Sequence, residues 1–343
     1  MHLNKKVLYD MFEELSKAPL IYQPSEHWQG LNNLHLEQIS EGGINNFKRS
    51  VNMKYFNWSI LGILVHQMKP VINELKKGNL SIFVKTRFRG YNAKLGRKVT
   101  EYDFISAQVY KIFVASLFNF VKSKDKLNIF DILQEPAAGN PFMIKYKDKV
   151  ITQDLCNSVL EFYNIIQDTD QNKKINIVEI GAGYGRLAHV FLKMFPKSTY
   201  TIIDIPVALY LAQEYLSSVF PKEKIFYFRH FKSYKEIKKE FETSRIRFIM
   251  AHDIEHLPDK EFDYVINISS LHEMSRPQIK NYIKQINRLG KGYFYQKQWR
   301  KSRVKDNDYI KENEYPIPKK WKTIYHRNHP VQKWFFEALY QIK

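Results

Sequence analysis

Residues 176–186 of the 343-residue chain read Asn-Ile-Val-Glu-Ile-Gly-Ala-Gly-Tyr-Gly-Arg, and this stretch decides the fold. An apolar strand ends near an acidic residue, and glycines then follow at three alternate positions. Glycine adopts the backbone conformations of a tight turn and lets a ligand approach without meeting a Cβ atom. A helix expected at Arg186–Phe195 would direct the positive end of its dipole toward that ligand. The stretch therefore predicts a strand, a ligand-binding turn and a helix.

The spacing of the glycines indicates which cofactor the turn would hold. A dinucleotide fold requires G-x-G-x-x-G, in which the third glycine packs the helix against the strand. Here the pattern is E-x-G-x-G-x-G, and Arg186 stands where that third glycine would be. In this form the stretch resembles motif I of the class I S-adenosylmethionine (SAM) methyltransferases, which implies SAM as the cofactor.

Further strands and helices follow in the alternation of an α/β domain. Strands are expected at Tyr200–Asp204, Arg247–Asp253 and Phe262–Ser270, with helices at Val207–Phe220 and Lys232–Glu242 between them. This rhythm predicts an α/β fold with a doubly wound, mostly parallel sheet that is covered by helices on both faces.

Polar side chains stand at the ends of four expected strands, namely Glu179, Asp204, Asp253 and Asn267. Ligands of such sheets bind at the carboxyl ends of the strands, and an acid about 20 residues after the glycine turn can accept hydrogen bonds from ribose hydroxyls. Any one of these residues is explained equally well as a solvated strand end. Four of them at one edge favour a ligand site.

The chain is expected to divide near residue 150. Residues 1–150 lack the alternation, and residues 151–343 contain it. Helical periodicity precedes the first strand at Val7–Lys17, Phe56–Lys76, Tyr102–Lys122 and Asp154–Ile166. We therefore expect a mainly helical N-terminal region that binds or covers the acceptor, followed by a methyltransferase domain with a basic C-terminal extension.

Charge and cysteine content restrict the class of protein. The chain has 54 Lys and Arg against 35 Asp and Glu, a formal net charge of +19, which implies an anionic partner. The single cysteine, Cys156, excludes an intramolecular disulfide and a cysteine metal cluster. The opening residues do not resemble a signal peptide, and the apolar run Ile60–Val65 is too short to span a bilayer. A cytoplasmic protein with no transmembrane segment is the expectation.

A histidine and a carboxylate follow the Phe262–Ser270 strand, as His272-Glu273. A neutral imidazole can take a proton from a hydroxyl as its oxygen attacks a methyl group. A neighbouring carboxylate could stabilise the imidazolium. His272 is thus the predicted base, although a packing or capping role at the next helix is the alternative. Because adjacent residues of a helix do not face each other, Glu273 could instead orient another group.

A resemblance gives these residues a more specific meaning. Asp204-Ile205-Pro206 and Leu271-His272-Glu273 look like segments of small-molecule O-methyltransferases in which that histidine is the base. The wider pattern is similar to the bacterial sugar O-methyltransferase family over roughly residues 80 to 300. It comprises Glu135-Pro136 with Gly139-Asn140-Pro141, Gln153-Asp154-Leu155 with Asn157-Ser158 and Glu161, Glu179 to Ala188, Asp204-Ile205-Pro206 and Glu273-Met274. The resemblance implies methylation of a sugar hydroxyl in surface polysaccharide or nucleotide-sugar biosynthesis, and it leaves open which sugar carrier is the acceptor.

The resemblance also implies roles for individual residues. Those expected to hold SAM are Glu179, Gly181, Ala182, Gly183, Tyr184, Asp204, Ile205, Asp253, Ile254, Asn267 and Ser269. Within this set, Asp253 and Ile254 would border the adenine, and Asn267 and Ser269 would line the methyl-donor end. Two basic, aromatic segments supply candidate acceptor contacts, which are Arg87, Tyr91, Gln296 and Trp299. A strand is expected at Tyr293–Tyr295, and the segment Gln296–Arg300 just beyond it could form a pocket rim. A solvated basic face explains either segment equally well.

Two other classes stay open. The positive charge favours a nucleic-acid methyltransferase, but the chain has no [Asp/Asn]-Pro-Pro-[Tyr/Phe] motif, and Cys156 has no second cysteine for base C5 chemistry. No stable nucleic-acid partner is therefore expected. A non-catalytic module that binds SAM or a dinucleotide is the second alternative. Asp253, His272 and Glu273 could also supply ligands to Mg²⁺, although no metal site is predicted from them.

Overall fold

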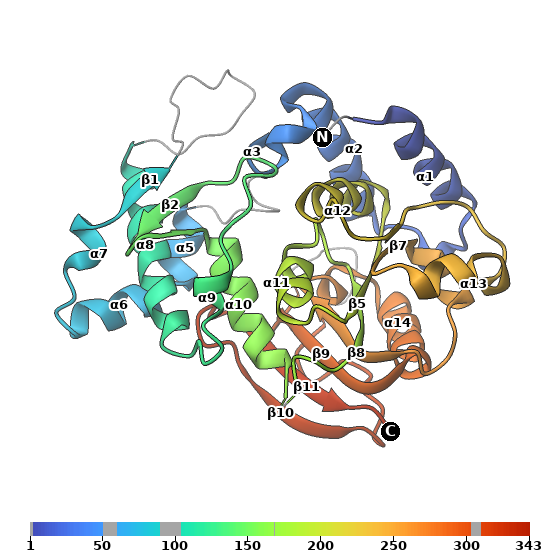
Figure 1. Cartoon of the computed structure of the whole chain (residues 1–343). Helices are drawn as coiled ribbons and strands as arrows, with labels where there is room; N and C mark the ends of the chain where they lie inside the picture. The colour runs from blue at the N-terminus through green and yellow to red at the C-terminus, as the bar shows by residue number, and fades with distance from the viewer. Residues whose placement is uncertain (1–2, 51–59, 90–103, 168, 303–309) are drawn as a thin grey trace. The chain divides into compact units, whose positions relative to one another are not determined.

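The computed structural model describes the chain except for residues 1–2, 51–59, 90–103, 168 and 303–309 (Figure 1). The chain forms two compact units. The first contains residues 34–168 and 330–333, with the first three residues of the chain, and the second contains residues 4–33, 169–329 and 334–343. These units differ from the expected domains in three segments. Residues 4–33 belong to the second unit, whereas residues 151–168 and 330–333 belong to the first.

The second unit is built on an eight-stranded sheet with the order β10-β11-β9-β8-β4-β5-β7-β6. Its strands are β4 (Asn176–Ile180), β5 (Thr199–Asp204), β6 (Ile225–Phe226), β7 (Ile246–Met250), β8 (Phe262–Ile268), β9 (Gly290–Trp299), β10 (Lys322–Asn328) and β11 (Phe335–Gln341). The six strands from β4 to β9 pair in parallel, whereas β11 pairs antiparallel with both β9 and β10. The predicted doubly wound, mostly parallel sheet is confirmed.

Helices cover both faces of this sheet. They are α11 (Arg186–Met194), α12 (Pro206–Val219), α13 (Tyr234–Thr243) and α14 (Arg276–Leu289). Successive side chains of a strand point to opposite faces. On β5, Ile203 belongs to the apolar cluster that includes α13 and α14, whereas Ile202 lies near Gly185 at the start of α11. The chain order reverses at β4, so the carboxyl ends of β4 and β8 flank the position where such folds bind ligands.

Local sequence explains where these helices begin. Pro206 occupies the first turn of α12, where a missing N–H costs nothing. A capping box starts α14, because the Ser275 side chain accepts from the Gln278 N–H while the Gln278 side chain accepts from the Ser275 N–H. The N-terminal helix α1 (Lys5–Lys17) also belongs to the second unit, and the backbone N–H of Asn4 donates to the Tyr210 hydroxyl of α12 at 2.6 Å.

The first unit is mainly helical, as predicted for most of its length. Its helices are α3 (Phe47–Ser50), α5 (Ile60–His66), α6 (Lys69–Lys76), α7 (Ser81–Val84), α8 (Phe104–Lys122), α9 (Ile129–Ile132) and α10 (Gln153–Ile165), and α2 (Glu26–Gly42) crosses the boundary between the units. The expected single helix over Phe56–Lys76 is divided into α5 and α6, because Pro70 favours a new helix start.

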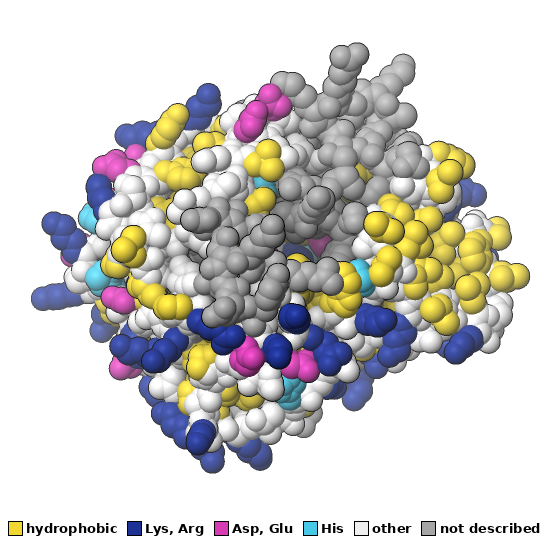
Figure 2. All heavy atoms as spheres, turned by 180° about the vertical axis from the view of Figure 1, so that it is seen from behind, with side chains coloured by type: hydrophobic (Ala, Val, Ile, Leu, Met, Phe, Trp, Pro, Cys, Tyr) yellow, Lys and Arg dark blue, Asp and Glu magenta, His cyan; other side chains and the backbone are white. Residues whose placement is uncertain are grey.

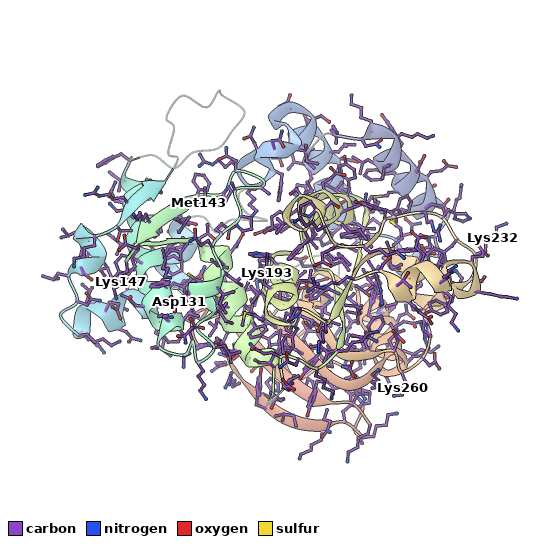
Figure 3. All side chains as sticks on the ribbon, viewed as in Figure 1. Asp131, Met143, Lys147, Lys193, Lys232 and Lys260 are labelled. Carbon is purple, nitrogen blue, oxygen red and sulfur yellow. The ribbon has the colours of Figure 1, made fainter. Side chains whose placement is uncertain are left out.

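A small antiparallel sheet completes the first unit. Its strands are β1 (Arg87–Arg89), β2 (Met143–Tyr146) and β3 (Lys149–Ile151). The two-residue turn Lys147-Asp148 joins β2 to β3 with both φ angles positive, as a tight hairpin requires (Figure 3). Nearby, the buried Lys48 ammonium contacts the Glu135 carboxylate at 2.6 Å, and Thr152 donates to the same carboxylate at 2.7 Å.

One helix of the described chain, α8, is long and apolar enough to span a membrane by length and composition. It has 19 residues, and half of its most apolar window is buried within the protein. The run Ile60–Val65 lies in the shorter helix α5 and does not reach this length. Partial burial of this kind is typical of a core helix.

Candidate functional site

The glycine turn after β4 has the backbone that its sequence predicts. Gly181, Gly183 and Gly185 have φ angles of 73°, 61° and 81°. A Cβ atom on Gly181 would lie 2.2 Å from the Ser270 Oγ, and the Gly181 N–H donates to the Ile203 carbonyl at 2.8 Å. The turn is therefore fitted tightly between the ends of β5 and β8.

Gly185 performs the packing role that a dinucleotide fold gives to its third glycine. A Cβ atom there would lie 3.0 Å from both the Ile202 and the Leu216 Cδ1 atoms. The close approach of helix and strand thus occurs one residue before Arg186, which begins α11.

Asp204 at the end of β5 holds the glycine turn. One carboxylate oxygen accepts from the Gly183 N–H at 2.9 Å, and the other accepts from the Ile205 N–H at 2.8 Å. Burial raises the pKa of Asp204 to about 7, and the two backbone N–H donors oppose that rise. The Asp204 carboxylate therefore links the backbone of Gly183 to that of Ile205.

Glu179 has a different environment from the other strand-end residues. Its buried carboxylate accepts from the Tyr200 hydroxyl at 2.7 Å. Two further residues of the predicted set face the protein interior or its backbone. Tyr184 is buried with its ring edge against Tyr215, with ring centroids 5.1 Å apart, and the Ala182 carbonyl accepts from the Gly185 N–H. Ala182 and Tyr184 would therefore contribute backbone rather than side-chain contacts.

A chain of buried amides joins the glycine turn to His272. The Asn267 Nδ2 donates to the Ile180 carbonyl at 2.8 Å, while its Oδ1 accepts from the Leu271 N–H at 3.1 Å. The Gln298 Nε2 donates to the same Asn267 Oδ1 at 2.6 Å. The Gln298 Oε1 therefore faces His272, from which it accepts the backbone N–H at 3.3 Å and contacts Nδ1 at 2.9 Å.

This chain of amides determines the tautomer of His272. The Leu271 and His272 backbone N–H groups can only donate, so they fix the orientation of both amides. Since the Gln298 Oε1 can only accept, Nδ1 of His272 carries the proton and Nε2 keeps its lone pair. The Trp299 N–H also points at Nδ1, but at 3.4 Å it is the weaker contact. The sequence analysis singled out His272 but not the residues that set its protonation.

The surroundings of His272 keep its ring neutral. The side chain is fully buried and stacks on the Trp299 indole at a centroid distance of 4.6 Å. Burial lowers the pKa of His272 to about 4, although the Gln298 contact opposes that shift. Among the described residues, Nε2 has no hydrogen-bond partner. A buried nitrogen with a free lone pair is a candidate proton acceptor.

Glu273 lies beside this lone pair, with its Oε1 at 3.7 Å from Nε2. Its other oxygen accepts from the Trp28 indole N–H at 3.0 Å. Burial raises the pKa of Glu273 to about 8, and the negative charge of Asp204 adds to the rise. The two side chains lie close together although they are adjacent in sequence, on the short 3-10 turn Leu271–Glu273.

The remaining predicted cofactor residues follow neighbouring strands. Asp253 and Ile254 are buried in the 3-10 turn Ala251–His256 after β7. Burial raises the pKa of Asp253 to about 7, with Glu14 adding to the rise. Ser269 adopts a φ of 56°, unusual for a residue other than glycine, and its N–H donates to the Lys297 carbonyl.

The predicted acceptor contacts have different environments in the two units. Trp299 packs on His272, but Gln296 is fully buried within β9 and does not form a pocket rim. The reason is that β9 continues to Trp299, whereas we expected the strand to end at Tyr295. Arg87 is exposed on β1 of the first unit, and Tyr91 lies outside the described residues.

No metal-binding group emerges from the described part of the chain, where no three His, Cys, Asp or Glu side chains are arranged to hold an ion. Trp28 and Gln298 are the functional candidates that the sequence analysis missed. The polar alternation Gln296-Lys297-Gln298 inside an apolar strand was the available signal for Gln298. No local pattern indicated Trp28, because its partner Glu273 is 245 residues away in the sequence.

No model of a known protein family matches the chain, and no curated protein matches it. Solved structures with a similar fold include a SAM-dependent methyltransferase from Aquifex aeolicus, at 14% identity over 66% of this chain and 98% of that chain, with a TM-score of 0.34. Magnesium protoporphyrin IX methyltransferase from Synechocystis PCC 6803, solved with bound SAH, has 11% identity over 56% of this chain and 82% of its own, with a TM-score of 0.38. An arsenic(III) SAM methyltransferase from Chlamydomonas reinhardtii has 14% identity over 55% of this chain and 73% of its own, with a TM-score of 0.34. With TM-scores this low, we base the function on the residues of this chain.

Proposed function

We propose that the chain is a SAM-dependent methyltransferase. The observation that carries the proposal is the contact of Asp204 with the N–H of Gly183, which places a buried carboxylate against a glycine turn at the carboxyl ends of β4 and β5. Such an edge is the ligand position of doubly wound sheets. The E-x-G-x-G-x-G motif, which resembles that of SAM enzymes, supports SAM over NAD as the ligand.

The residues present fit SAM. The positive φ angles of the three glycines let the backbone turn sharply beside the ligand. Asp204 would accept from the ribose hydroxyls, and Asp253 with Ile254 would border the adenine. A cationic ligand near Asp204 would favour its ionised form and so repay part of the cost of burying it.

When bound, SAM would supply an electrophilic methyl group on a cationic sulfur. The chain's own task is to hold an acceptor oxygen in line with that methyl group and to remove the proton of the hydroxyl. Correct positioning is worth about 7–11 kcal/mol at best. The Nε2 lone pair of His272, oriented by Gln298, would take the proton, and the adjoining Glu273 carboxylate, in its ionised form, would stabilise the cation that forms.

The proposed acceptor is a sugar hydroxyl of a nucleotide sugar or a surface polysaccharide precursor, and the proposed location is the cytoplasm. The resemblance of the motifs between residues 135 and 274 to the sugar O-methyltransferase family supports the sugar. The net charge of +19 supports an acceptor that carries phosphate or carboxylate.

Transfer of labelled methyl from SAM to nucleotide sugars, extracted surface glycans and total RNA tests this proposal. We expect label in one of the sugar pools, and we expect His272→Ala to reduce it by about 10²–10⁴-fold. His230→Ala is a matched control, because His230 is exposed and pairs with Glu14 away from His272. Label in RNA alone would overturn the sugar assignment. Full activity of His272→Ala would show that another group takes the proton.

A further inference from the structure

Large apolar side chains are exposed together in one region of the first unit. Of the 16 that are exposed in the described chain, ten fall between residues 61 and 105. They are Leu61, Leu64 and Val65 of α5, Ile72 and Leu75 of α6, Leu80, Phe83 and Val84 at α7, and Phe104 and Ile105 of α8. We call these ten residues the apolar face. Figure 2 shows a broad yellow area where α5 to α7 lie.

This exposure is a property of whole helices. The inner sides of α5, α6 and α7 already pack within the unit through Ile63, Val71 and Ile82, which are at most 4% exposed. Their outer sides are apolar as well, and Leu61 and Val84 are 71% and 79% exposed. A helix that is apolar on both sides normally has an apolar environment on both sides. A contiguous exposed patch of this kind marks an interaction surface.

Positive charge borders the apolar face. Lys69, Lys76, Lys77, Lys85 and Arg87 are all exposed on or beside α6 and α7. The only acidic residue between positions 60 and 88 is Glu74, which is buried, pairs with Lys77 at 3.3 Å and is bonded to the side chains of Asn79 and Asn119. Over these positions the face therefore combines apolar side chains with an excess of cations.

Charge decides which partner fits. A second copy of this chain would bring the same basic border against itself, on a molecule that already carries a net charge of +19. A bilayer with anionic lipids matches both features of this surface. Its acyl boundary can bury the apolar side chains, and its phosphates attract the Lys and Arg side chains. We propose that the apolar face docks on an anionic membrane surface and lies in the plane of the headgroups. This inference stands independently of the methyl-transfer reaction.

Sedimentation of the full chain with vesicles tests the inference. We expect binding to vesicles that contain phosphatidylglycerol as the anionic lipid, and much weaker binding to pure phosphatidylcholine. Leu61→Glu and Val84→Glu should each weaken binding by at least about tenfold, because each replaces an exposed apolar side chain that would enter the acyl boundary of the bilayer. Lys76→Ala with Lys77→Ala should weaken it by about 30-fold. Leu20→Glu is the matched control, since Leu20 is 88% exposed but belongs to the second unit.

The replaced side chains are exposed, so their loss should leave the thermal unfolding midpoint nearly unchanged. Binding that is lost in the variants of the apolar face and kept in Leu20→Glu would support the inference. Equal binding of all variants, or no vesicle binding by the wild-type chain, would overturn it. A dimer in sedimentation velocity that Val84→Glu dissociates, without any vesicle binding, would overturn it in favour of a second copy.

Discussion

Replacing Gln298 by leucine removes the central link between the glycine turn and His272. The wild-type Oε1 atom is the acceptor for two buried donors, the backbone N–H and the Nδ1–H of His272. Leucine has nearly the same size but accepts nothing. An unsatisfied buried donor costs about 1–3 kcal/mol, so Gln298→Leu should lower the free energy of unfolding by about 1–3 kcal/mol for the His272 backbone N–H, since the ring proton can move to Nε2. Asn267 keeps its bonds to Ile180 and Leu271, which limits the loss to the His272 side.

The chain supplies a matched control on the same strand. Gln296 is also fully buried in β9, but its amide makes one long contact, at 3.4 Å to the Tyr340 hydroxyl, and its Oε1 has no partner among the described residues. Gln296→Leu should therefore change the free energy of unfolding by less than about 1 kcal/mol or increase it. Urea unfolding followed by circular dichroism measures both variants.

The same pair of variants separates stability from catalysis. Without Gln298, Nδ1 of His272 has no acceptor, and the proton can move to Nε2, where it blocks the proposed base. Turnover of Gln298→Leu should fall by at least about tenfold, while that of Gln296→Leu should stay near the wild-type value. Equal destabilisation by the two variants, or full turnover of Gln298→Leu, would refute the role assigned to the amide chain.

Three further predictions concern stability, and each can be measured by urea unfolding. Gly181→Ala should lower the free energy of unfolding by more than about 1 kcal/mol, because of its φ of 73° and the clash with Ser270. Adding Ser270→Gly removes the clash and should recover only part of this loss. Full recovery would show that the φ angle imposes no strain. Glu273 has a pKa raised to about 8, so its neutral carboxyl stabilises the fold fully below pH 4.5 and this stability is lost as the pH rises through 8. Glu273→Gln should flatten the decline between these values, and an unchanged slope would contradict the raised pKa. Lys48→Met should lower the free energy of unfolding by about 3–5 kcal/mol, because it leaves the buried Glu135 carboxylate without its cation. Adding Glu135→Leu should restore most of that stability. A much smaller loss in Lys48→Met alone would mean that the pair is not effectively buried.

The sequence predicted those elements whose signals are local. Strands β4, β5, β7 and β8 and helices α11, α12 and α13 begin and end within a few residues of expectation, because apolar runs, glycine turns and Pro206 mark them. The antiparallel pair β10 and β11 was not predicted. Most of β10 is exposed at the sheet edge, so its sequence lacks the apolar alternation that marks a half-buried strand.

The site divides in the same way. Glycines and polar strand ends are local patterns, and the structure places Asp204 against Gly183 and Glu273 beside His272. The groups that tune them come from distant parts of the chain, such as Trp28 on α2 and Gln298 on β9. Gln296 was predicted to lie beyond the end of a strand, at a pocket rim. It is instead buried inside β9, which continues to Trp299.

Isothermal titration of the wild-type chain and Asp204→Asn with SAM and with NAD tests most directly whether the glycine turn is a SAM site. The account predicts that the wild type binds SAM and not NAD. Asp204→Asn should weaken SAM binding by about 10–100-fold, because hydrogen bonds to a charged group contribute about 1.5–3 kcal/mol. Thermal unfolding of the variant would establish that it is folded. Binding of NAD without SAM, or equal SAM affinity in a folded Asp204→Asn variant, would contradict the account.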